Sequence, residues 1–374
     1  MLPRYLKEEY EIHYSSKDEI YQRLLEKFPS QKQHIHEILM PTPIDGKSGP
    51  SVSMSLLNVF LPVSKNPPLL KQISDYLREE GRLYDKEKFD LVINDGDMGS
   101  NVLAKNRGIP SVFVTNQFMP KLWSTRVYFY PSLYFIAKQI AKATTDKIKN
   151  KVTYVGHYAN RKLTTEKFQT DLQRLIEGTN FGYWMRTGNR STNIITGQKY
   201  EEIFHDNKMD SERRLVSHAK NDPTINKVLG RDGKSYSISE ALEKKVDWLQ
   251  IDIGFLSEHE KDAVLRLCDY VVTNGSHTVV GEIVGIYAKP IIGIPVYDEH
   301  TNNLRCVEEQ GLGILARNKK QVLDAITQIK NHIDRFGERL EVYKKNFVGD
   351  GAQTTAKIVC EMLENNRKDN RFNQ

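Results

Sequence analysis

The stretch Tyr270–Gly313 carries the densest group of residues that could bind a phosphorylated ligand. Its first residues, Tyr270-Val-Val-Thr, predict a buried strand, and Val279–Tyr287 has the pattern of a helix. Between them, the small residues of Asn274-Gly-Ser-His-Thr would let the first backbone N–H groups of the helix point towards an anion. The site predicted from this pattern, suited to a pyrophosphate, consists of Gly275, Ser276, His277 and Thr278.

Further polar residues follow in order along the same stretch. Glu282 lies one helical turn beyond Thr278, where its carboxylate could accept hydrogen bonds from two ribose hydroxyls. After an apolar strand, the loop Val296-Tyr-Asp-Glu-His-Thr-Asn-Asn offers several side chains that bind hydroxyl groups. Gly-Leu-Gly at Gly311–Gly313 then closes a helix with a glycine cap. One such loop is common in α/β proteins, but this ordered series is difficult to obtain by chance.

The elements that position these residues belong to a chain of 374 residues, a length suited to two domains. Hydrophobic residues make up 39% and charged residues 27%, so the chain can bury a core. A net charge of +6 does not demand nucleic acid as a partner, and we expect none. There is no apolar run of about 18 residues and no secretory signal, and the cysteines form no metal spacing or disulfide framework. We therefore expect a soluble protein of the cytoplasm.

Short apolar runs alternate with amphipathic stretches, a pattern typical of α/β domains with parallel sheets. We expect an N-terminal domain over 1–155, a second domain over 156–348, and a helix with a polar tail over 349–374. The predicted strands are Tyr10–Tyr14, Phe89–Ile93, Ser111–Thr115, Gly182–Arg186, Arg214–Ser217, Leu249–Ile253, Tyr270–Thr273 and Pro290–Ile294.

The ordered series in Tyr270–Gly313 resembles the C-terminal domain of glycosyltransferases of the GT-B fold, which use nucleotide sugars. The chain is similar to the lipid II-forming N-acetylglucosaminyltransferase, the UDP-glucuronosyltransferases and the chitobiosyl-forming enzymes of dolichol pathways. The resemblance covers about Phe181–Glu364 well and Phe89–Gln117 more weakly. It implies an α/β architecture in which two Rossmann-like domains face each other across a cleft.

The resemblance implies a role for each matching position of the donor domain. Ser276, His277 and Thr278 would bind the diphosphate, and Glu282 would hold the ribose hydroxyls. The residues that would face the donor sugar are Asp298, Glu299 and Asn303. Phe255 and Leu256 match the strand end at which such enzymes read uracil through the backbone. The loop that would approach the phosphates contains Arg186, Gly188, Asn189 and Arg190. A solvated turn would account for its two arginines equally well.

The N-terminal domain departs from the family pattern. Such a domain normally opens with a buried strand and a glycine-rich loop, whereas here a helix is predicted over Leu2–Glu9. Either the domain is built differently or its first strand and loop are missing, and we favour the second interpretation. A start codon assigned too far downstream would explain the gap, and so would a degenerate, non-catalytic protein.

The acceptor side is represented by Asp95-Gly-Asp97 after a buried strand, with Thr115-Asn-Gln117 after the next strand. Related enzymes that build chitobiosyl lipids place a carboxylate near this strand end. Asp95 or Asp97 could therefore deprotonate an acceptor hydroxyl if partial burial raises its pKa. Asp95 could instead cap the following helix. We do not interpret the two aspartates as a metal site, and we expect no metal ion and no cofactor.

The segment 121–138 combines aromatic side chains with Lys121, Arg126 and Lys138. This composition suits peripheral contact with a membrane that carries a lipid-linked acceptor, but an aromatic helix in a domain core would also have it. The remaining histidines of interest, expected to be structural or solvated, are His13, His34, His36 and His157.

The sequence thus predicts an inverting, metal-independent glycosyltransferase. The expected reaction moves a sugar, N-acetylglucosamine, from a UDP-sugar donor to a polyprenyl-linked or other acceptor. Two other functions fit the same residues. A sugar-nucleotide-binding subunit would bind nucleotide without forming product. A UDP-sugar epimerase shares the architecture but needs several charged catalytic residues across the cleft, and the sequence does not identify that set.

Overall fold

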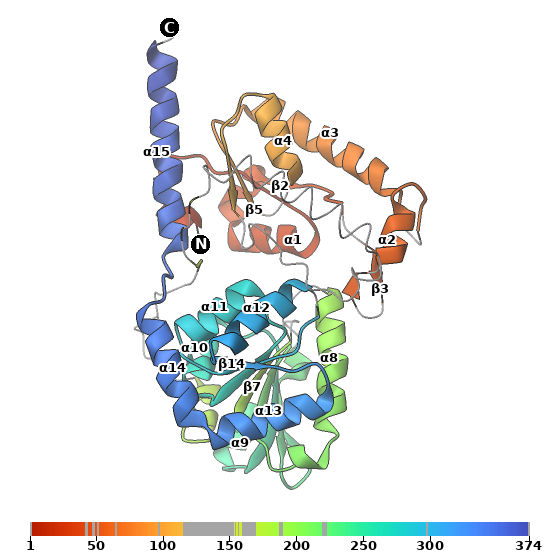
Figure 1. Ribbon diagram of the computed structural model, residues 1–374, viewed down its shortest axis with the longest axis vertical. Coiled ribbons are helices and arrows are strands. Elements are labelled where there is room, and N and C mark those ends of the chain that lie inside the picture. Colours follow the sequence, from red (N-terminus) through yellow and green to blue (C-terminus); the bar gives the residue numbers. More distant parts are fainter. Residues whose placement is uncertain are drawn as a thin grey trace. The chain divides into compact units, whose positions relative to one another are not determined.

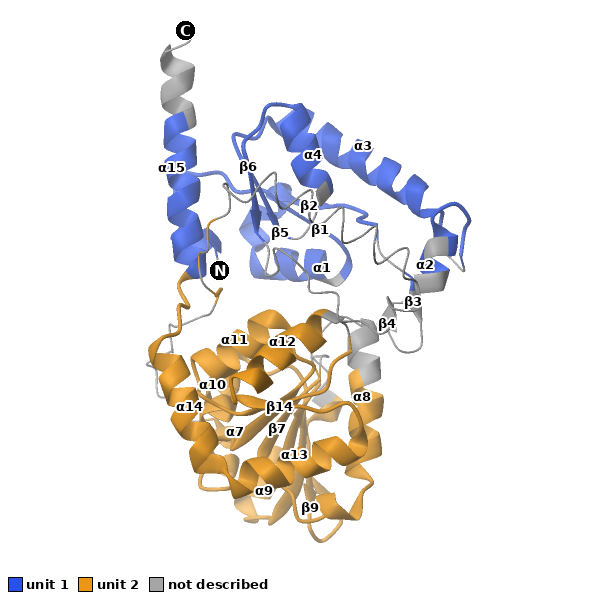
Figure 2. Cartoon of the chain, viewed as in Figure 1, with its two compact units in different colours: residues 1–118, 351–374 blue, residues 119–350 orange. Residues whose placement is uncertain are grey.

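The computed structural model describes most of the chain outside one long central segment. The described residues are 2–41, 44–46, 49–50, 52–63, 66–95, 98–114, 153, 155, 157–158, 170–186, 190–218, 223–296 and 298–372. They form two compact units (Figure 2), of which unit 1 is Met1–Phe118 with Gly351–Gln374 and unit 2 is Met119–Asp350. The predicted domain boundary near residue 155 falls where only scattered residues are described, so it stays a prediction. No helix in the described ranges is long and apolar enough to cross a membrane.

Unit 1 is built from short strands and surrounding helices (Figure 1). Its strands are β1 (Tyr14–Ser16), β2 (Ile35–Glu37), β3 (Asp45–Gly46), β4 (Gly49–Pro50), β5 (Val92–Asp95) and β6 (Ser111–Val114). Its helices are η1 (Leu2–Tyr5), α1 (Asp18–Lys27), η2 (Pro29–His34), α2 (Val52–Asn58), α3 (Leu69–Glu87), α4 (Met98–Asn106) and α15 (Gly351–Phe372). β1 pairs with β2 and β5 with β6, both parallel, while β3 and β4 are antiparallel.

A small apolar cluster of Tyr84, Val92, Leu103 and Ala104 packs α3 and α4 against β5. The C-terminal helix α15 packs on η1, and the Nζ atom of Lys7 lies 2.7 Å from a carboxylate oxygen of Glu364. Both ends of the chain therefore contribute to unit 1.

Unit 2 contains one eight-stranded sheet with a continuous core. Its strands are β7 (Gly182–Met185), β8 (Arg214–Ser217), β9 (Lys227–Gly230), β10 (Ser235–Tyr236), β11 (Trp248–Ile253), β12 (Tyr270–Thr273), β13 (Ile291–Gly293) and β14 (Gly313–Leu315). Its helices are α7 (Asp171–Ile176), α8 (Arg190–Phe204), η4 (Asn207–Met209), η5 (Pro223–Ile225), α9 (Ile238–Glu243), α10 (Glu258–Leu267), α11 (His277–Gly285), α12 (Asp298–Glu309), α13 (Lys319–Asn331) and α14 (Ile333–Lys345).

The strand order across this sheet is β10-β9-β11-β8-β7-β12-β13-β14. The pairs from β11 to β14 are parallel, whereas β9 runs antiparallel to β11 and β10. Every residue of β7, β8 and β12 is buried, as expected for central strands covered on both faces. Figure 1 shows the sheet flanked by α8 and by α10 and α11.

Several predicted elements differ from the structure. The predicted helix over Leu2–Glu9 is only the short 3-10 helix η1, and the first strand starts at Tyr14 rather than Tyr10. The hairpin of β9 and β10 was not predicted, although its connection contains Asp232-Gly233, a strong turn signal, and Gly233 has a positive φ of 77°. β14 was also missed, because its three residues are too few to show a pattern.

Candidate functional site

The strand order of unit 2 points to one place on the sheet. If its six parallel strands are numbered along the chain from β7 to β14, their order across the sheet is 3-2-1-4-5-6. In sheets of this kind, ligands bind outside the carboxyl ends of the strands where the order reverses. That point lies between the neighbouring strands β7 and β12. The chain leaves β7 at Arg186 and β12 at Asn274, so the predicted site residues stand at this edge.

The loop after β12 is held in a specific conformation by side chains around it. Asn274 is buried, and its Oδ1 atom accepts a hydrogen bond of 3.2 Å from the Ser276 backbone N–H. Gly275 has a positive φ of 89°, which residues with a Cβ atom rarely adopt. Asn303, on α12, donates from Nδ2 to the Gly275 carbonyl oxygen at 3.0 Å. These contacts fix the backbone that leads into α11.

The N-terminus of α11 differs from those of two other helices of unit 2, α9 and α10. Ser237 and Ser257 each accept a hydrogen bond from the third residue of α9 and α10 in a complete capping box. Ser276, the N-cap of α11, forms no such side-chain bond. The first backbone N–H groups of α11, which begins with His277 and Thr278, can therefore bind an anion, and the helix dipole favours negative charge there.

Glu282 is mostly buried on α11 and already has a partner. Its Oε2 atom lies 2.5 Å from the Nζ atom of Lys261, which comes from α10. Oε1 has no hydrogen-bond partner among the described residues. The carboxylate is thus held by a cation on one oxygen, which leaves Oε1 and a second lone pair of Oε2 for the predicted ribose contact.

A chain of polar side chains crosses the carboxyl ends of β7, β8 and β11. Nη1 of Arg186 lies 3.1 Å from Nδ1 of His218. The other ring nitrogen of His218, Nε2, lies 2.9 Å from Oδ1 of Asp252. Gln250 donates from Nε2 to the other Asp252 oxygen at 2.7 Å. Gly197 on α8 faces the Arg186 guanidinium, and a Cβ atom there would overlap with it.

Sequence reasoning identified Arg186 but missed His218 and Asp252. The missed pair becomes visible only when β8 and β11 are known to be parallel neighbours, with Ile253 in register with Ser217. Nε of Arg186 is buried and has no partner within the described part of the chain. A guanidinium positioned in this way presents a fixed positive charge near the switch point.

His157 and His277 stack beside the same loop, with ring centroids 4.9 Å apart. His157 also stacks on Phe347, and its backbone N–H donates to the Val348 carbonyl at 2.8 Å. Burial lowers the pKa of His157 to about 4, and it lowers the pKa of His277 as well. Both rings are therefore neutral at pH 7 and can accept or donate hydrogen bonds without carrying charge.

The remaining predicted donor residues lie on two other elements. Glu299 and Asn303 are on α12, and Asn303 contacts the loop after β12 as described above. Phe255 and Leu256 follow β11, where Phe255 is 60% exposed and Leu256 is buried. The exposed ring of Phe255 leaves an apolar surface at this strand end.

Some predicted residues cannot be placed. Asp97, Gly188, Asn189 and the segment 121–138 lie outside the described residues, and of Arg190 and Asp298 only the backbone is described. Asp95 is described and ends β5 in unit 1, where it is exposed. Desolvation by neighbouring protein atoms nevertheless raises the pKa of its carboxyl above the usual value. That direction is the one a general base needs.

Comparison with known proteins gives a result only at the level of the fold. No protein-family model matches the sequence, and no curated protein matches it. The structure is similar to that of the glycosyltransferase of kitacinnamycin, with a TM-score of 0.59 and 13% identity over 94% of this chain and 91% of that one.

Two further structures show the same likeness. The UDP-GlcNAc 2-epimerase from Neisseria meningitidis, bound to UDP-GlcNAc, has a TM-score of 0.55 at 11% identity, covering 94% of this chain and 99% of that one. MurG from Acinetobacter baumannii has a TM-score of 0.50 at 10% identity, covering 94% and 91%. The predicted α/β architecture is therefore confirmed as a GT-B-like fold, which glycosyltransferases and epimerases share.

Proposed function

We propose that this protein is a glycosyltransferase that takes its sugar from a UDP-sugar donor bound at the carboxyl ends of β7 and β12. The observation that carries the proposal is the uncapped N-terminus of α11 at the point where the strand order reverses. A nucleoside diphosphate is the ligand class that this edge of an open α/β sheet suits best.

The described residues support a division of roles within the donor site. The first N–H groups of α11 and the Arg186 guanidinium would stabilise the diphosphate as it leaves. Glu282 would accept a hydrogen bond from a ribose hydroxyl through Oε1, and the backbone near Phe255 would bind the base. Glu299 and Asn303 would contact the sugar. No metal ion is required by this set, since helix dipole and guanidinium supply the positive charge.

Asp95 is the candidate for the base that deprotonates the acceptor hydroxyl. A transferred sugar needs an acceptor oxygen that loses its proton as the new bond forms. Because desolvation raises the pKa of Asp95, its carboxylate is a stronger base than an ordinary exposed aspartate. We propose a lipid-linked hydroxyl as the acceptor and N-acetylglucosamine as the sugar.

A UDP-sugar 2-epimerase is the second candidate, and a specific observation favours it. His218 and Asp252 lie at the carboxyl ends of β8 and β11, and they form a pair in which the carboxylate orients the imidazole. Such a pair can move a proton, as an epimerase requires. One of the similar structures is an epimerase bound to UDP-GlcNAc.

Two measurements in sequence test these proposals. The first is the melting temperature of the full chain with UDP, GDP, ADP or dTDP at millimolar concentration. A ligand at 100 times its Kd adds about 2.7 kcal/mol of stability, so selective stabilisation by UDP is expected. Stabilisation by another nucleotide would mean that the donor is a sugar of that nucleotide. If no nucleotide raised the melting temperature, the proposed donor site would be contradicted.

The second measurement separates transfer from epimerisation. UDP-GlcNAc is incubated with the protein alone and then with a short-chain polyprenyl phosphate or diphosphate-sugar acceptor, and the products are resolved by chromatography. Transfer predicts UDP and a glycosylated lipid only when the acceptor is present. Epimerisation predicts a UDP-sugar inverted at C2 without any acceptor. UDP binding with neither product would leave a non-catalytic binding subunit as the function.

A further inference from the structure

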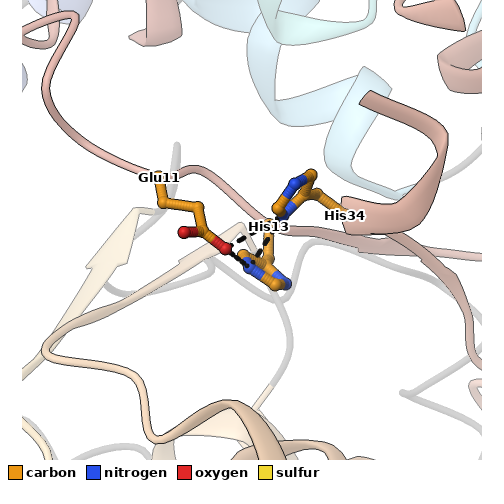
Figure 3. Close-up of side chains that lie close together, drawn as sticks. All are labelled: Glu11, His13 and His34. Atoms are coloured by element: carbon orange, nitrogen blue, oxygen red, sulfur yellow. Dashed lines mark hydrogen bonds and ion pairs between the residues drawn. The ribbon is translucent and has the colours of Figure 1, made fainter. Parts of the chain in front are cut away.

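A second group of ionisable side chains lies in unit 1. Figure 3 shows Glu11, His13 and His34 pointing towards one another. Nε2 of His13 lies 2.9 Å from Oε1 of Glu11 and 3.0 Å from Nδ1 of His34. Nδ1 of His34 in turn lies 3.1 Å from Oε1 of Glu11. One atom from each of the three residues thus forms a nearly equilateral triangle.

The pairing of the first two strands creates this cluster. β1 and β2 run parallel with Tyr14 in register with Ile35, so His13 and His34 immediately precede the first paired residues. Glu11 lies two residues before His13, in the segment that leads into β1. The His13 side chain is only 10% exposed and that of His34 21%, which fixes both rings, whereas Glu11 is open to water at 68%.

Protons alone cannot satisfy the three contacts. The ionised carboxylate of Glu11 brings no hydrogen, so the two nitrogens must supply every donor. If both nitrogens are protonated, their hydrogens oppose each other across 3.0 Å. If only one is protonated, the lone pair of the other faces the lone pairs of the carboxylate oxygen. A cation at the centre removes this conflict, because all three atoms can then offer it a lone pair. The other nitrogen of His34, Nε2, then carries the proton and donates it to the amide oxygen of Gln33. That oxygen must take the place of the Gln33 amide nitrogen, which lies 2.9 Å from Nε2.

A fourth residue orients the cluster. Nδ1 of His13 lies 3.0 Å from Nε2 of His36, and the two rings stack with their planes 9° apart. If His13 carries its proton on Nδ1 and donates it to His36, Nε2 is left with a free lone pair directed at Glu11 and His34. Histidines that bind metals commonly donate their second ring N–H in this way, which fixes the tautomer.

The geometry points to a divalent transition-metal site formed by Glu11, His13 and His34, with His36 as a positioning residue, and we propose Zn²⁺ as its ion. Two imidazoles and one carboxylate suit Zn²⁺ and its neighbours in the first transition row, whereas Mg²⁺ and Ca²⁺ prefer oxygen ligands throughout. Water would complete the coordination.

The observed separations fit such an ion with little movement. Ligand atoms about 2.1 Å from one ion lie about 3.0 Å apart in octahedral geometry and about 3.4 Å apart in tetrahedral geometry. The three edges of the cluster, 2.9, 3.0 and 3.1 Å, match the octahedral separation closely and are shorter than the tetrahedral one by about 0.3–0.5 Å.

The position of the cluster indicates a structural role for the ion. Phe89 contacts His13 with ring centroids 5.2 Å apart, and it precedes β5, whereas Asp95 ends that strand. Five residues separate Phe89 from Asp95, and Asp90 among them forms a bend. The ion would fasten the segment before β1 to the start of β2, beside Phe89 rather than at the end of β5 where Asp95 lies.

The test is metal binding by the full chain, purified without a histidine tag and stripped with a chelator. Zn²⁺ is titrated in competition with a chromogenic chelator, and Co²⁺ binding is followed through its visible absorption, which reports the ligands. We expect one ion per chain, a higher melting temperature with Zn²⁺ and no shift with Mg²⁺.

Variants tie the ion to these residues. His36→Ala should weaken Zn²⁺ binding about 10–100-fold, as expected for loss of an orienting partner, and His13→Ala should weaken it more. Glu11→Gln changes an exposed side chain and should fold normally while also losing affinity. His205→Ala, at an exposed histidine of unit 2, is the control and should bind as the unchanged protein does. Circular dichroism of the metal-free proteins verifies that each variant is folded.

Two results would overturn the proposal. One is a stoichiometry well below one ion per chain. The other is the same Zn²⁺ affinity in His13→Ala and Glu11→Gln as in the unchanged protein, which would locate the ion elsewhere. Neither result affects the nucleotide-binding proposal, because UDP stabilisation is measured separately and concerns unit 2.

Discussion

The side chain of Leu304 occupies the space beside Gly275 that a Cβ atom would need, since an added Cβ would lie 2.5 Å from Leu304 Cγ. The next residue back along α12, Asn303, donates to the Gly275 carbonyl. Two successive residues of one helix therefore define the loop that opens α11. The anion-binding geometry of α11 depends on the packing of α12.

Gly275→Ala should damage both the stability of unit 2 and its nucleotide binding. The positive φ costs an alanine about 1–2 kcal/mol, and the overlap with Leu304 adds about 1–3 kcal/mol. Urea unfolding followed by tryptophan fluorescence measures the loss, because Trp184 and Trp248 are buried in unit 2.

Gly337→Ala is the matched control for this substitution. Gly337 lies within α14, and nothing is found within 4 Å of a Cβ atom built there. An alanine in a helix interior should stabilise unit 2 by about 0.5–1 kcal/mol. Equal effects of the two substitutions would contradict the role given to Leu304.

Arg186→Gln should weaken UDP binding by about 1.5–3 kcal/mol, or roughly 10–150-fold, because a charge-assisted contact to the diphosphate is lost. Isothermal titration calorimetry measures the change. Arg213→Gln is the comparison. Arg213 lies just before β8, at the opposite end of that strand from His218, and it forms an ion pair with Asp247. It should leave UDP affinity unaltered, and a similar loss in both variants would show that the effect is one of overall charge.

Glu282→Gln should reduce UDP affinity by about 1–3 kcal/mol through the lost ribose contact. The ion pair with Lys261 complicates this result, because its loss could move the loop without any direct contact to ligand. Lys261→Met removes the same ion pair and keeps the carboxylate. If Glu282 holds the ribose, Lys261→Met retains most of the affinity and the double variant resembles Glu282→Gln. A loss in Lys261→Met as large as that in Glu282→Gln would assign the effect to the ion pair.

Unit 2 should lose stability between pH 6.5 and pH 4. Burial lowers the pKa of His157 and of His300 to about 4, whereas the unfolded value is about 6.5. In this window the unfolded chain binds protons that the folded chain does not, so stability is complete above pH 6.5 and falls as pH decreases. Each histidine accounts for a loss of at most about 3 kcal/mol in the free energy of unfolding.

His157→Phe tests the assignment, since phenylalanine can stack on His277 and Phe347 but cannot titrate. The free energy of unfolding in urea should depend less steeply on pH in this variant. His205→Phe changes an exposed histidine and should keep the original slope. An unchanged slope in His157→Phe would mean that His157 titrates normally in the folded protein.

The central strands of unit 2 could be predicted from the sequence because local patterns specify them. Tyr270–Thr273 and Arg214–Ser217 have the predicted bounds, since each contains a pair of adjacent apolar residues with polar residues close on both sides. The loop at Gly275 was predicted on the same basis. A positive φ favours glycine, and the strand before it and the helix after it are both recognisable.

The features that escaped prediction depend on pairing between distant segments. His218 meets Asp252 only because β8 and β11 are neighbours. The same is true of His13 and His34, which the sequence places far apart and which were expected to be structural or solvated. β1 itself lies at Tyr14–Ser16, where two serines give no apolar pattern, and its pairing with β2 defines it. Such contacts follow from topology, which local sequence does not reveal.

The place of α15 in unit 1 affects the order in which the protein can fold during synthesis. Unit 2 is one continuous stretch of chain, so it can complete its sheet as soon as residue 350 has left the ribosome. Unit 1 must wait with its early strands already made, because η1 packs on a helix that is translated after all of unit 2. In nascent chains, unit 2 should therefore become resistant to protease before unit 1 does.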